Sequence, residues 1–259
     1  MDDRTPPTFH SAAYTFPMFL AALRARDRRP ELMDDPALPP DRHRRALAGL
    51  ARINRWTGAA NLLWPPLKRL AASLGRPLRV LDVATGSGDI PLSLARRADR
   101  AGLPMDLSGC DISPTAVAEA NLQVCRDTTG RADAPRLRFF VHDVLRDPLP
   151  AGYDAVICSL FVHHLDEADA IRLLARMKAA TDRLVLVNDL ARGRFNFCAV
   201  WLASRVLSRS RIVHTDGPLS VRGAFTVNEM KALADAAGLA GAVVKSKFPC
   251  RQLLTWEKA

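Results

Sequence analysis

The chain has 259 residues, of which 48% are hydrophobic and 25% are charged. These ordinary globular values exclude wholesale disorder, a fibrous protein and a small disulfide-rich scaffold. The net charge of +10 would suit nucleic acid, but the arginines are scattered over several clusters instead of one tract. We therefore do not expect a nucleic acid as the partner.

The five cysteines are widely spaced and form no C-x-x-C pair. We therefore expect no metal site, and a reducing cytoplasm fits this cysteine usage. The apolar stretches are too short, or too interrupted by arginine, for the about 20 residues that cross a bilayer. The N-terminus also lacks the basic region of a signal peptide, so the sequence predicts a cytoplasmic protein without a membrane span.

The N-terminal part of the chain predicts helices. Leu47, Leu50 and Ile53 recur at spacings of three, which indicates a helix over residues 43–56. A second helix is predicted over residues 61–74, restarted or kinked at its two prolines. We expect residues 1–74 to form an extension and a helical cap, and residues 75–259 to form one further domain.

From residue 75 onward, strands and helices alternate. Short apolar runs predict strands over residues 78–84, 105–111, 137–142, 153–160 and 183–188. Helical patterns lie between them, over residues 90–98, 114–126 and 166–180. This alternation is typical of a parallel sheet with helices on both faces.

The alternation ends after residue 188. An apolar helix is predicted over residues 195–207, where it could cover a ligand as a lid, and a basic loop over residues 208–222. Thr226 and Glu229 form a capping-box pattern that starts a helix over residues 227–237. Two closing strands, over residues 242–248 and 252–257, are expected to pair as a hairpin.

Polar residues stand at or near the ends of the predicted strands. They are Asp82, Asp111, Asp143, Ser159 and Asn188. In open α/β sheets the ligand lies outside the carboxyl ends of the strands. These residues are therefore the first candidates for a binding site.

A glycine loop, Gly86-Ser87-Gly88, joins the first strand to the next helix and suits a nucleotide-type ligand. The dinucleotide fingerprint requires a third glycine where this chain has Pro91. Asp82 precedes the loop, where a carboxylate repels phosphate and attracts a cationic amine. These features disfavour a dehydrogenase.

At these residues the chain resembles the class I S-adenosylmethionine-dependent methyltransferases. The segment from Asp82 to Gly88 resembles the loop that holds the methionine part of the cofactor, although Ala84 replaces a glycine of the usual pattern. Asp111 matches the ribose-binding acid and Asp143 the acid that contacts adenine. The resemblance implies a Rossmann-like, doubly wound seven-stranded sheet with an antiparallel last strand. It also implies contacts with S-adenosylmethionine, or its product S-adenosylhomocysteine, from Arg52, Asp82, Ala84, Thr85, Gly86, Gly88, Asp111, Ile112, Asp143, Val144 and Ser159.

His163 and His164 follow the fourth strand, and His214 lies in the predicted loop. Imidazole can take a proton from a phenol near neutral pH, so all three are candidate bases. The candidate acceptor contacts are Asn188, Phe197, Trp201 and Arg222. Apolar and aromatic residues in the expected cap and lid suit an aromatic or polyketide-like acceptor.

The resulting hypothesis is methyl transfer to a small aromatic molecule, first of all to a phenolic oxygen. The similar enzymes act in quinone and secondary metabolism. Methylation of an activated ring carbon or a quinone is the alternative. An RNA or protein methyltransferase and a non-catalytic cofactor-binding subunit are the other classes left open, and the sequence leaves the oligomeric state undetermined.

Overall fold

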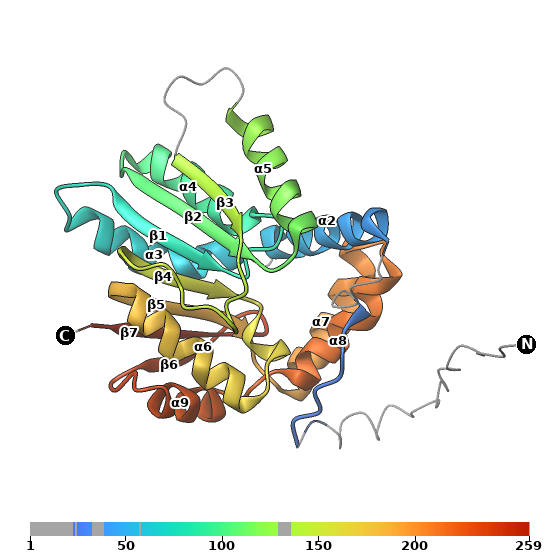
Figure 1. The fold of residues 1–259 in the computed structure, drawn as a ribbon. Coiled ribbons are helices and arrows are strands. Elements are labelled where there is room, and N and C mark those ends of the chain that lie inside the picture. The colour runs from blue at the N-terminus through green and yellow to red at the C-terminus, as the bar shows by residue number, and fades with distance from the viewer. Residues whose placement is uncertain (1–22, 24, 33–38, 57, 129–135, 259) are drawn as a thin grey trace, which may run out of the picture.

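A mixed sheet forms the centre of the computed structural model, which describes residues 23, 25–32, 39–56, 58–128 and 136–258 (Figure 1). Its seven strands lie in the order β3-β2-β1-β4-β5-β7-β6. The strands are β1 Leu78–Val83, β2 Met105–Asp111, β3 Arg136–Val141, β4 Tyr153–Ser159, β5 Thr181–Leu190, β6 Val243–Lys247 and β7 Arg251–Glu257. β7 pairs antiparallel with both β5 and β6, and the other pairs are parallel. The predicted Rossmann-like sheet is confirmed.

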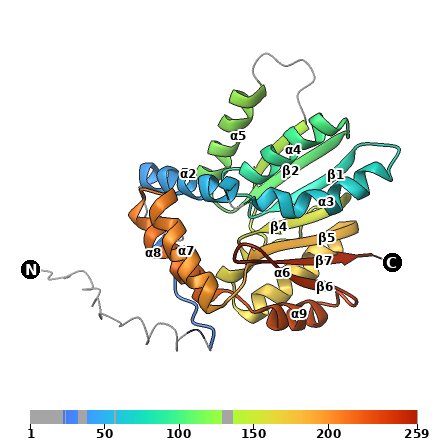
Figure 2. The ribbon, with the colours of Figure 1, turned by 180° about the vertical axis from the view of Figure 1, so that it is seen from behind.

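Alternate residues of the strands are buried against opposite layers of helices. Val80 faces α3 (Ala59–Ala72) and α4 (Asp89–Ala101), while Leu81 faces α6 (Glu167–Ala180) and α9 (Val227–Ala236). α5 (Pro114–Thr128) packs on Phe139 of β3. Figures 1 and 2 show these two helical layers on either side of the sheet. Apolar burial on both faces explains why the strands have nearly continuous apolar sequences.

Three further helices gather beyond the carboxyl ends of the parallel strands (Figures 1 and 2). They are α2 (Pro40–Trp56), α7 (Arg194–Leu207) and α8 (Arg211–Gly223), and a short 3-10 turn, η2 (Val162–His164), lies below them. α7 and α8 pack on each other and both contact α2. This arrangement places a helical cover over the edge of the sheet where the polar residues end the strands.

The predicted loop over residues 208–222 is wrong, because most of it forms α8. Gly217-Pro218 is typical of a turn in sequence, but both residues lie inside the helix. A Cβ on Gly217 would lie 3.3 Å from Val200 of α7, so the glycine allows the two helices to approach closely. Val213 and Val221 are buried on the covered side. Tertiary packing therefore outweighs the local turn signal.

Two further predictions about helices have different outcomes. α3 continues through Pro65 and Pro66 without the predicted restart. The capping box is confirmed: Thr226 Oγ1 accepts from the Glu229 N–H, and Glu229 Oε2 accepts from the Thr226 N–H at 2.8 Å. Leu63 of α3 shares a core cluster with residues of the strands. The expected division of the chain into a cap and a second domain at residue 75 stays a prediction.

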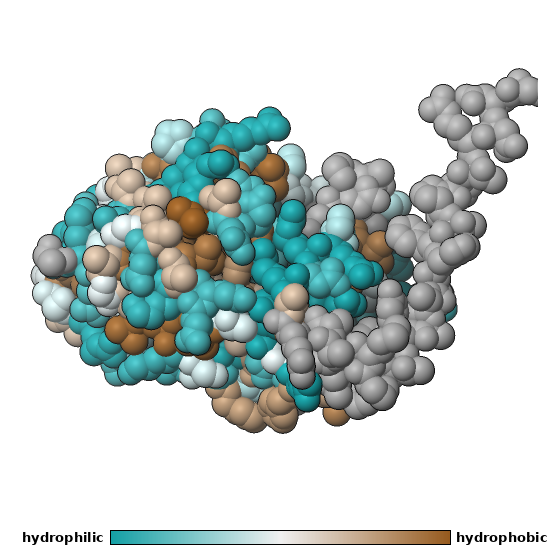
Figure 3. Space-filling view, turned by 90° about the horizontal axis from the view of Figure 1, so that it is seen from below, coloured by the Kyte–Doolittle hydropathy of each residue, from teal (hydrophilic) through white to brown (hydrophobic). Residues whose placement is uncertain are grey.

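Seen from below, the described residues show their apolar side chains in small groups among hydrophilic ones (Figure 3). Within the described ranges, none of the helices combines the length and apolar content that a membrane crossing requires.

Gly109 of β2 provides a test of the packing. A Cβ there would lie 2.7 Å from both Phe139 on β3 and Thr85 Oγ1. Gly109→Ala is expected to lower the free energy of unfolding by about 1–3 kcal/mol, because the ring must move out of a packed position. Urea denaturation measures the change.

Gly75→Ala is the matched control, since a Cβ at Gly75 meets nothing within 4 Å. It is expected to change the free energy of unfolding by less than about 0.5 kcal/mol. Equal effects of the two substitutions would contradict the close packing at Gly109.

Candidate active site

The loop after β1 bends through left-handed backbone conformations. Ala84 has φ 53°, Gly86 has φ 56° and Gly88 has φ 75°. Glycine adopts these values without cost, whereas alanine does so with strain, so the departure at Ala84 needs support from its surroundings. That support comes from β2: the Thr85 N–H donates to the Cys110 carbonyl at 3.0 Å, and the Gly86 N–H donates to Asp111 Oδ2 at 2.8 Å.

Gly88 has a packing role. It precedes α4 as its N-cap, and a Cβ there would lie 2.7 Å from the Phe139 ring and 3.1 Å from Ala120. The glycine therefore brings the start of α4 against α5 and β3. This contact places the N-terminus of α4 at the carboxyl edge of the sheet, where Asp89 and Ile90 line the cavity described below.

Asp82 is a buried carboxylate beneath this loop. Its side chain is nearly inaccessible, and Oδ2 accepts from the Thr85 hydroxyl at 2.7 Å. Oδ1 has no hydrogen-bond partner among the described residues. Burial raises the pKa of Asp82 to about 8, opposed by the Thr85 hydrogen bond and reinforced by the nearby Asp89 and Asp111. An oxygen in this state is prepared to receive a cationic donor.

The loop borders a cavity of about 1030 Å³ at the carboxyl ends of β1, β2 and β4. Eleven of the predicted residues line it: Asp82, Ala84, Thr85, Gly86, Asp111, Ile112, Asp143, Val144, Ser159, His163 and His164. The cavity lies where the order of the strands reverses between β1 and β4, which is the usual ligand position in a doubly wound sheet.

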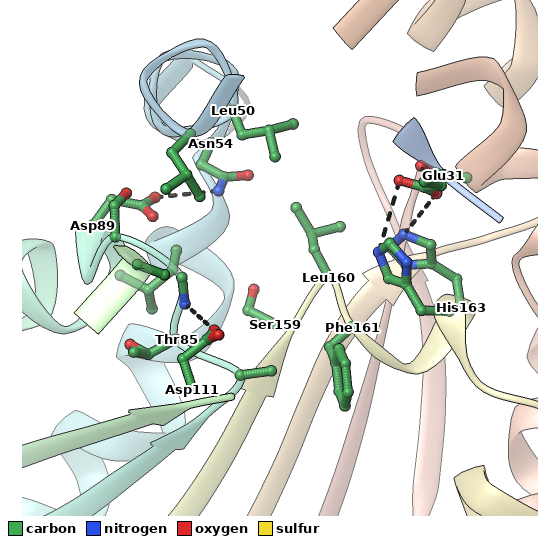
Figure 4. A pocket seen from close by; sticks show the side chains of 18 of the residues that line it. Glu31, Leu50, Asn54, Thr85, Asp89, Asp111, Ser159, Leu160, Phe161 and His163 are labelled. Atoms are coloured by element: carbon green, nitrogen blue, oxygen red, sulfur yellow. Dashed lines mark hydrogen bonds and ion pairs between the residues drawn. The ribbon is translucent and has the colours of Figure 1, made fainter. Parts of the chain in front are cut away.

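The two polar ends of the cavity are separate (Figure 4). Asp111 and Thr85 lie at one end, and Glu31 and His163 lie at the other. Ser159 and Leu160 stand between them on the end of β4. A ligand that reaches from one end to the other must therefore pass a largely apolar middle section.

Asp143 and Asn188 act on the wall of the cavity through their neighbours. Asp143 Oδ1 accepts from the main-chain N–H groups of Leu145 and Arg146, at 3.0 and 3.1 Å, and so shapes the loop after β3. Asn188 is fully buried behind the wall and donates to Ser159 Oγ at 2.8 Å. Its amide thereby fixes the orientation of a hydroxyl that faces the cavity.

The remaining predicted residues have contacts outside the cavity wall. Arg52 donates to the Leu207 carbonyl, and His214 Nε2 bonds to the Ser208 carbonyl at 2.8 Å. Phe197 is buried in a small cluster, Trp201 is partly exposed beneath the Arg205 guanidinium, and Arg222 pairs with Asp27. None of these five residues lines the cavity, and their roles in binding stay predictions.

His163 and His164 form the far end with residues that the sequence did not indicate. His163 Nδ1 lies 2.6 Å from Asp189 Oδ1, and both side chains are buried. Glu31 approaches from the N-terminal segment, with its two oxygens 3.8 Å from the Nε2 atoms of His163 and His164. Ser220 of α8 donates to Glu31 Oε1 at 2.5 Å.

Arg251 is a second residue that sequence reasoning missed. It starts β7, is buried, lines the cavity and donates to Asn54 Oδ1 at 3.2 Å. Burial lowers the pKa of Arg251 to about 10, although Asp189 and Asp89 oppose the shift. Its place in the chain could have predicted its position, because an antiparallel last strand starts at the edge of the sheet where the parallel strands end.

The pKa of Asp82 predicts a pH dependence of stability. In the unfolded chain Asp82 ionises near pH 4, and in the folded, ligand-free protein its pKa is about 8. The folded state therefore binds more protons between these values, and Asp82 lowers the free energy of unfolding as the pH rises through that window. Asp82→Asn removes this contribution. Relative to the wild type, the variant is expected to gain a few kcal/mol between about pH 5 and about pH 8.

Urea unfolding of both proteins at several pH values measures this difference. A difference that stays constant across the window would contradict the protonated state of Asp82.

Comparison with known proteins agrees with this geometry. Residues 80–183 match the family model described as a methyltransferase domain. Over 185 residues the chain is 32% identical to 3-hydroxy-5-methyl-1-naphthoate 3-O-methyltransferase from Streptomyces sahachiroi, covering 69% of this chain and 50% of the relative. It is 34% identical over 133 residues to demethylmenaquinone methyltransferase from Thermus thermophilus, covering 49% of this chain and 54% of the relative. The chain thus spans about half the length of these curated relatives.

A solved structure shares the fold over nearly the whole chain. Magnesium protoporphyrin IX methyltransferase from Synechocystis, crystallised with S-adenosylhomocysteine, superposes with a TM-score of 0.54 at 16% identity. The superposition covers 93% of both chains. Residues 80–183 therefore match a methyltransferase domain, and the chain as a whole shares the fold of this solved methyltransferase.

Proposed function

We propose that this protein transfers the methyl group of S-adenosylmethionine to a small aromatic acceptor. The observation that carries the proposal is the buried Oδ1 of Asp82, a residue that lines the cavity: this oxygen has no hydrogen-bond partner among the described residues. A protonated amino group, such as that of the methionine part of the cofactor, supplies the missing donor and favours the ionised carboxylate.

The other cofactor contacts follow from the same edge of the sheet. Asp111 ends β2 beside the glycine loop and can accept hydrogen bonds from the two ribose hydroxyls. Ile112, Asp143 and Val144 line the cavity beyond Asp111 and form the adenine end. Arg251, rather than the predicted Arg52, is the buried cation on the cavity wall that suits the cofactor's carboxylate.

The cavity has room for a second molecule beside the cofactor. Its volume of about 1030 Å³ is at the upper end of the range for single small-molecule sites. Leu50, Leu160, Phe161 and Val200 line it away from the cofactor end and suit a flat aromatic ring. The naphthoate and demethylmenaquinone named for the relatives are acceptors of this kind.

The cofactor supplies a methyl group on a sulfonium, which an acceptor atom can take by in-line displacement. The chain's task is to hold that atom in line and to keep water out, which can contribute several kcal/mol to lowering the barrier. His163 and His164 line the acceptor end, whereas His214 does not. We therefore place the acceptor's oxygen against His163 and His164. We also propose that the reaction takes place in the cytoplasm. Methylation of a ring carbon remains the alternative.

The cofactor site is tested by calorimetric titration with S-adenosylhomocysteine. Asp111→Ala is expected to weaken binding by about 100-fold or more, because two hydrogen bonds to a charged acceptor are lost at about 1.5–3 kcal/mol each. Asp106→Ala, at the opposite end of β2, is the matched control and is expected to leave the affinity unchanged. Absence of binding by the wild type would overturn the proposed function.

The acceptor class is tested by incubation with S-adenosylmethionine and either 3-hydroxy-5-methyl-1-naphthoate or a demethylmenaquinone. A product heavier by one methylene unit is expected in mass spectrometry, and NMR then assigns the methyl group to oxygen or carbon. Phe161→Ala is expected to raise KM by about 10-fold through the lost ring contact. Methylation of RNA or protein, with neither aromatic acceptor used, would refute the aromatic acceptor class.

A further inference from the structure

Glu31, His163 and His164 form a cluster of metal-ligand type at the acceptor end of the cavity. We propose that this Glu31–His163–His164 cluster binds one divalent transition-metal ion of the Zn²⁺ class. Each residue offers one ligand atom, and these three atoms all lie within 4.8 Å of one another. Two imidazole nitrogens and one carboxylate oxygen are ligands that Zn²⁺, Co²⁺ and similar ions prefer over Mg²⁺ or Ca²⁺.

The separations within the cluster fit an ion better than a hydrogen bond. His163 Nε2 lies 3.8 Å from Glu31 Oε1, and His164 Nε2 lies 3.8 Å from Glu31 Oε2. Dashed lines mark these contacts of Glu31 in Figure 4. An N–H···O hydrogen bond spans about 2.7–3.2 Å, so a proton does not bridge this gap. Ligand atoms that lie roughly 2.0–2.2 Å from a shared ion are about 3–4 Å apart. Both measured N–O separations fall in this range, and the three ligand atoms of the cluster lie within 4.8 Å of one another.

The buried carboxylate behind His163 orients that imidazole for metal binding. Asp189 Oδ1 lies 2.6 Å from the ring nitrogen Nδ1 of His163, and Asp189 Oδ2 accepts from the main-chain N–H of His163 at 3.0 Å. In the tautomer whose Nδ1 carries the proton, the Nε2 atom on the side of Glu31 has the lone pair that a metal ion requires. A carboxylate that holds the far nitrogen of a histidine is the usual outer partner in metal sites.

Arginines near the cluster stabilise its backbone. Arg26 donates to the carbonyls of His163 and Leu165, at 3.1 and 2.5 Å, and Arg28 donates to the carbonyl of His164 at 3.0 Å. These bonds hold the η2 turn in the conformation that brings both imidazoles, with ring centroids 4.3 Å apart, to the same side. Ser220 Oγ holds the carboxylate of Glu31 from α8. The cluster is thus positioned from three separate parts of the chain.

Three protein ligands leave at least one position of the ion open, which is the pattern of catalytic sites and not of structural ones. All three residues line the cavity, so the open position faces the acceptor. The metal site rests on these contacts alone. Its use rests on the proposed function: an oxygen of the aromatic acceptor becomes the next ligand and is held in line with the methyl group.

The test uses the full chain freed of metal by a chelator and then titrated with Co²⁺, whose visible absorption reports nitrogen ligation, and with Zn²⁺ by calorimetry. One ion per chain is expected. Glu31→Gln, His163→Ala and His164→Ala are each expected to weaken Zn²⁺ binding at least 10-fold and to change the Co²⁺ spectrum. Asp189→Asn is expected to weaken it by about 10- to 100-fold without removing a ligand.

His214→Ala is the control, since this histidine bonds to the Ser208 carbonyl outside the cluster, and it is expected to bind the metal as the wild type does. Circular dichroism of each variant checks that it folds, independently of S-adenosylhomocysteine binding. A wild type that binds S-adenosylhomocysteine but no Zn²⁺, or binds Zn²⁺ equally in all variants, overturns the metal site and leaves the proposed function intact. Zn²⁺ binding lost in the cluster variants of a chain that does not bind S-adenosylhomocysteine supports the metal site and refutes the proposed function.

Discussion

The carboxylate of Asp111 connects the ends of two strands. Its Oδ2 accepts from the Gly86 N–H in the loop after β1, and its Oδ1 accepts from the Ser113 N–H in the loop after β2. These bonds hold the glycine loop in its left-handed path and set the cofactor end of the cavity. Because β1 lies where the strand order reverses, the connections on its two sides lead in opposite directions, and the glycine loop forms a wall of the cavity between them. Both the burial of Asp82 and the start of α4 depend on this loop.

The sequence predicted the sheet, and the polar residues that meet at one edge of it, because their signals are local. Each apolar run that was read as a strand is a strand, with ends shifted by at most two residues. In the central strands β1, β4 and β5, burial on both faces leaves little choice of sequence. Asp82, Asp111 and Asp143 could be identified because a parallel sheet brings the carboxyl ends of its strands to one edge. Their positions along the chain therefore already implied their proximity in space.

The acceptor end could not be predicted in the same way, because its residues meet through long-range packing. Glu31 lies in a proline- and arginine-rich segment without periodicity, and only the folded chain brings it to His163, 132 positions later. The sequence contained the turn signal Gly217-Pro218, but α8 uses the glycine for contact with α7. Phe197, Trp201 and Arg222 were chosen for their chemistry near an expected lid, and the packing of α7 and α8 gives them other neighbours.

The N-terminal segment has a consequence for how the chain folds during synthesis. Arg26 donates to the Gly223 carbonyl, the Asp27 N–H donates to the Arg222 carbonyl, and Glu31 accepts from Ser220, contacts that join residues about 190 positions apart in sequence. A ribosome releases the glycine loop and β2 long before it releases α8. The cofactor end can therefore form early, whereas the emerged N-terminal segment has to wait for α8. Such non-local closure is slow, so the N-terminal segment stays without its α8 contacts while β1 to β5 are already synthesised, and a nascent-chain chaperone would have to protect it during that interval.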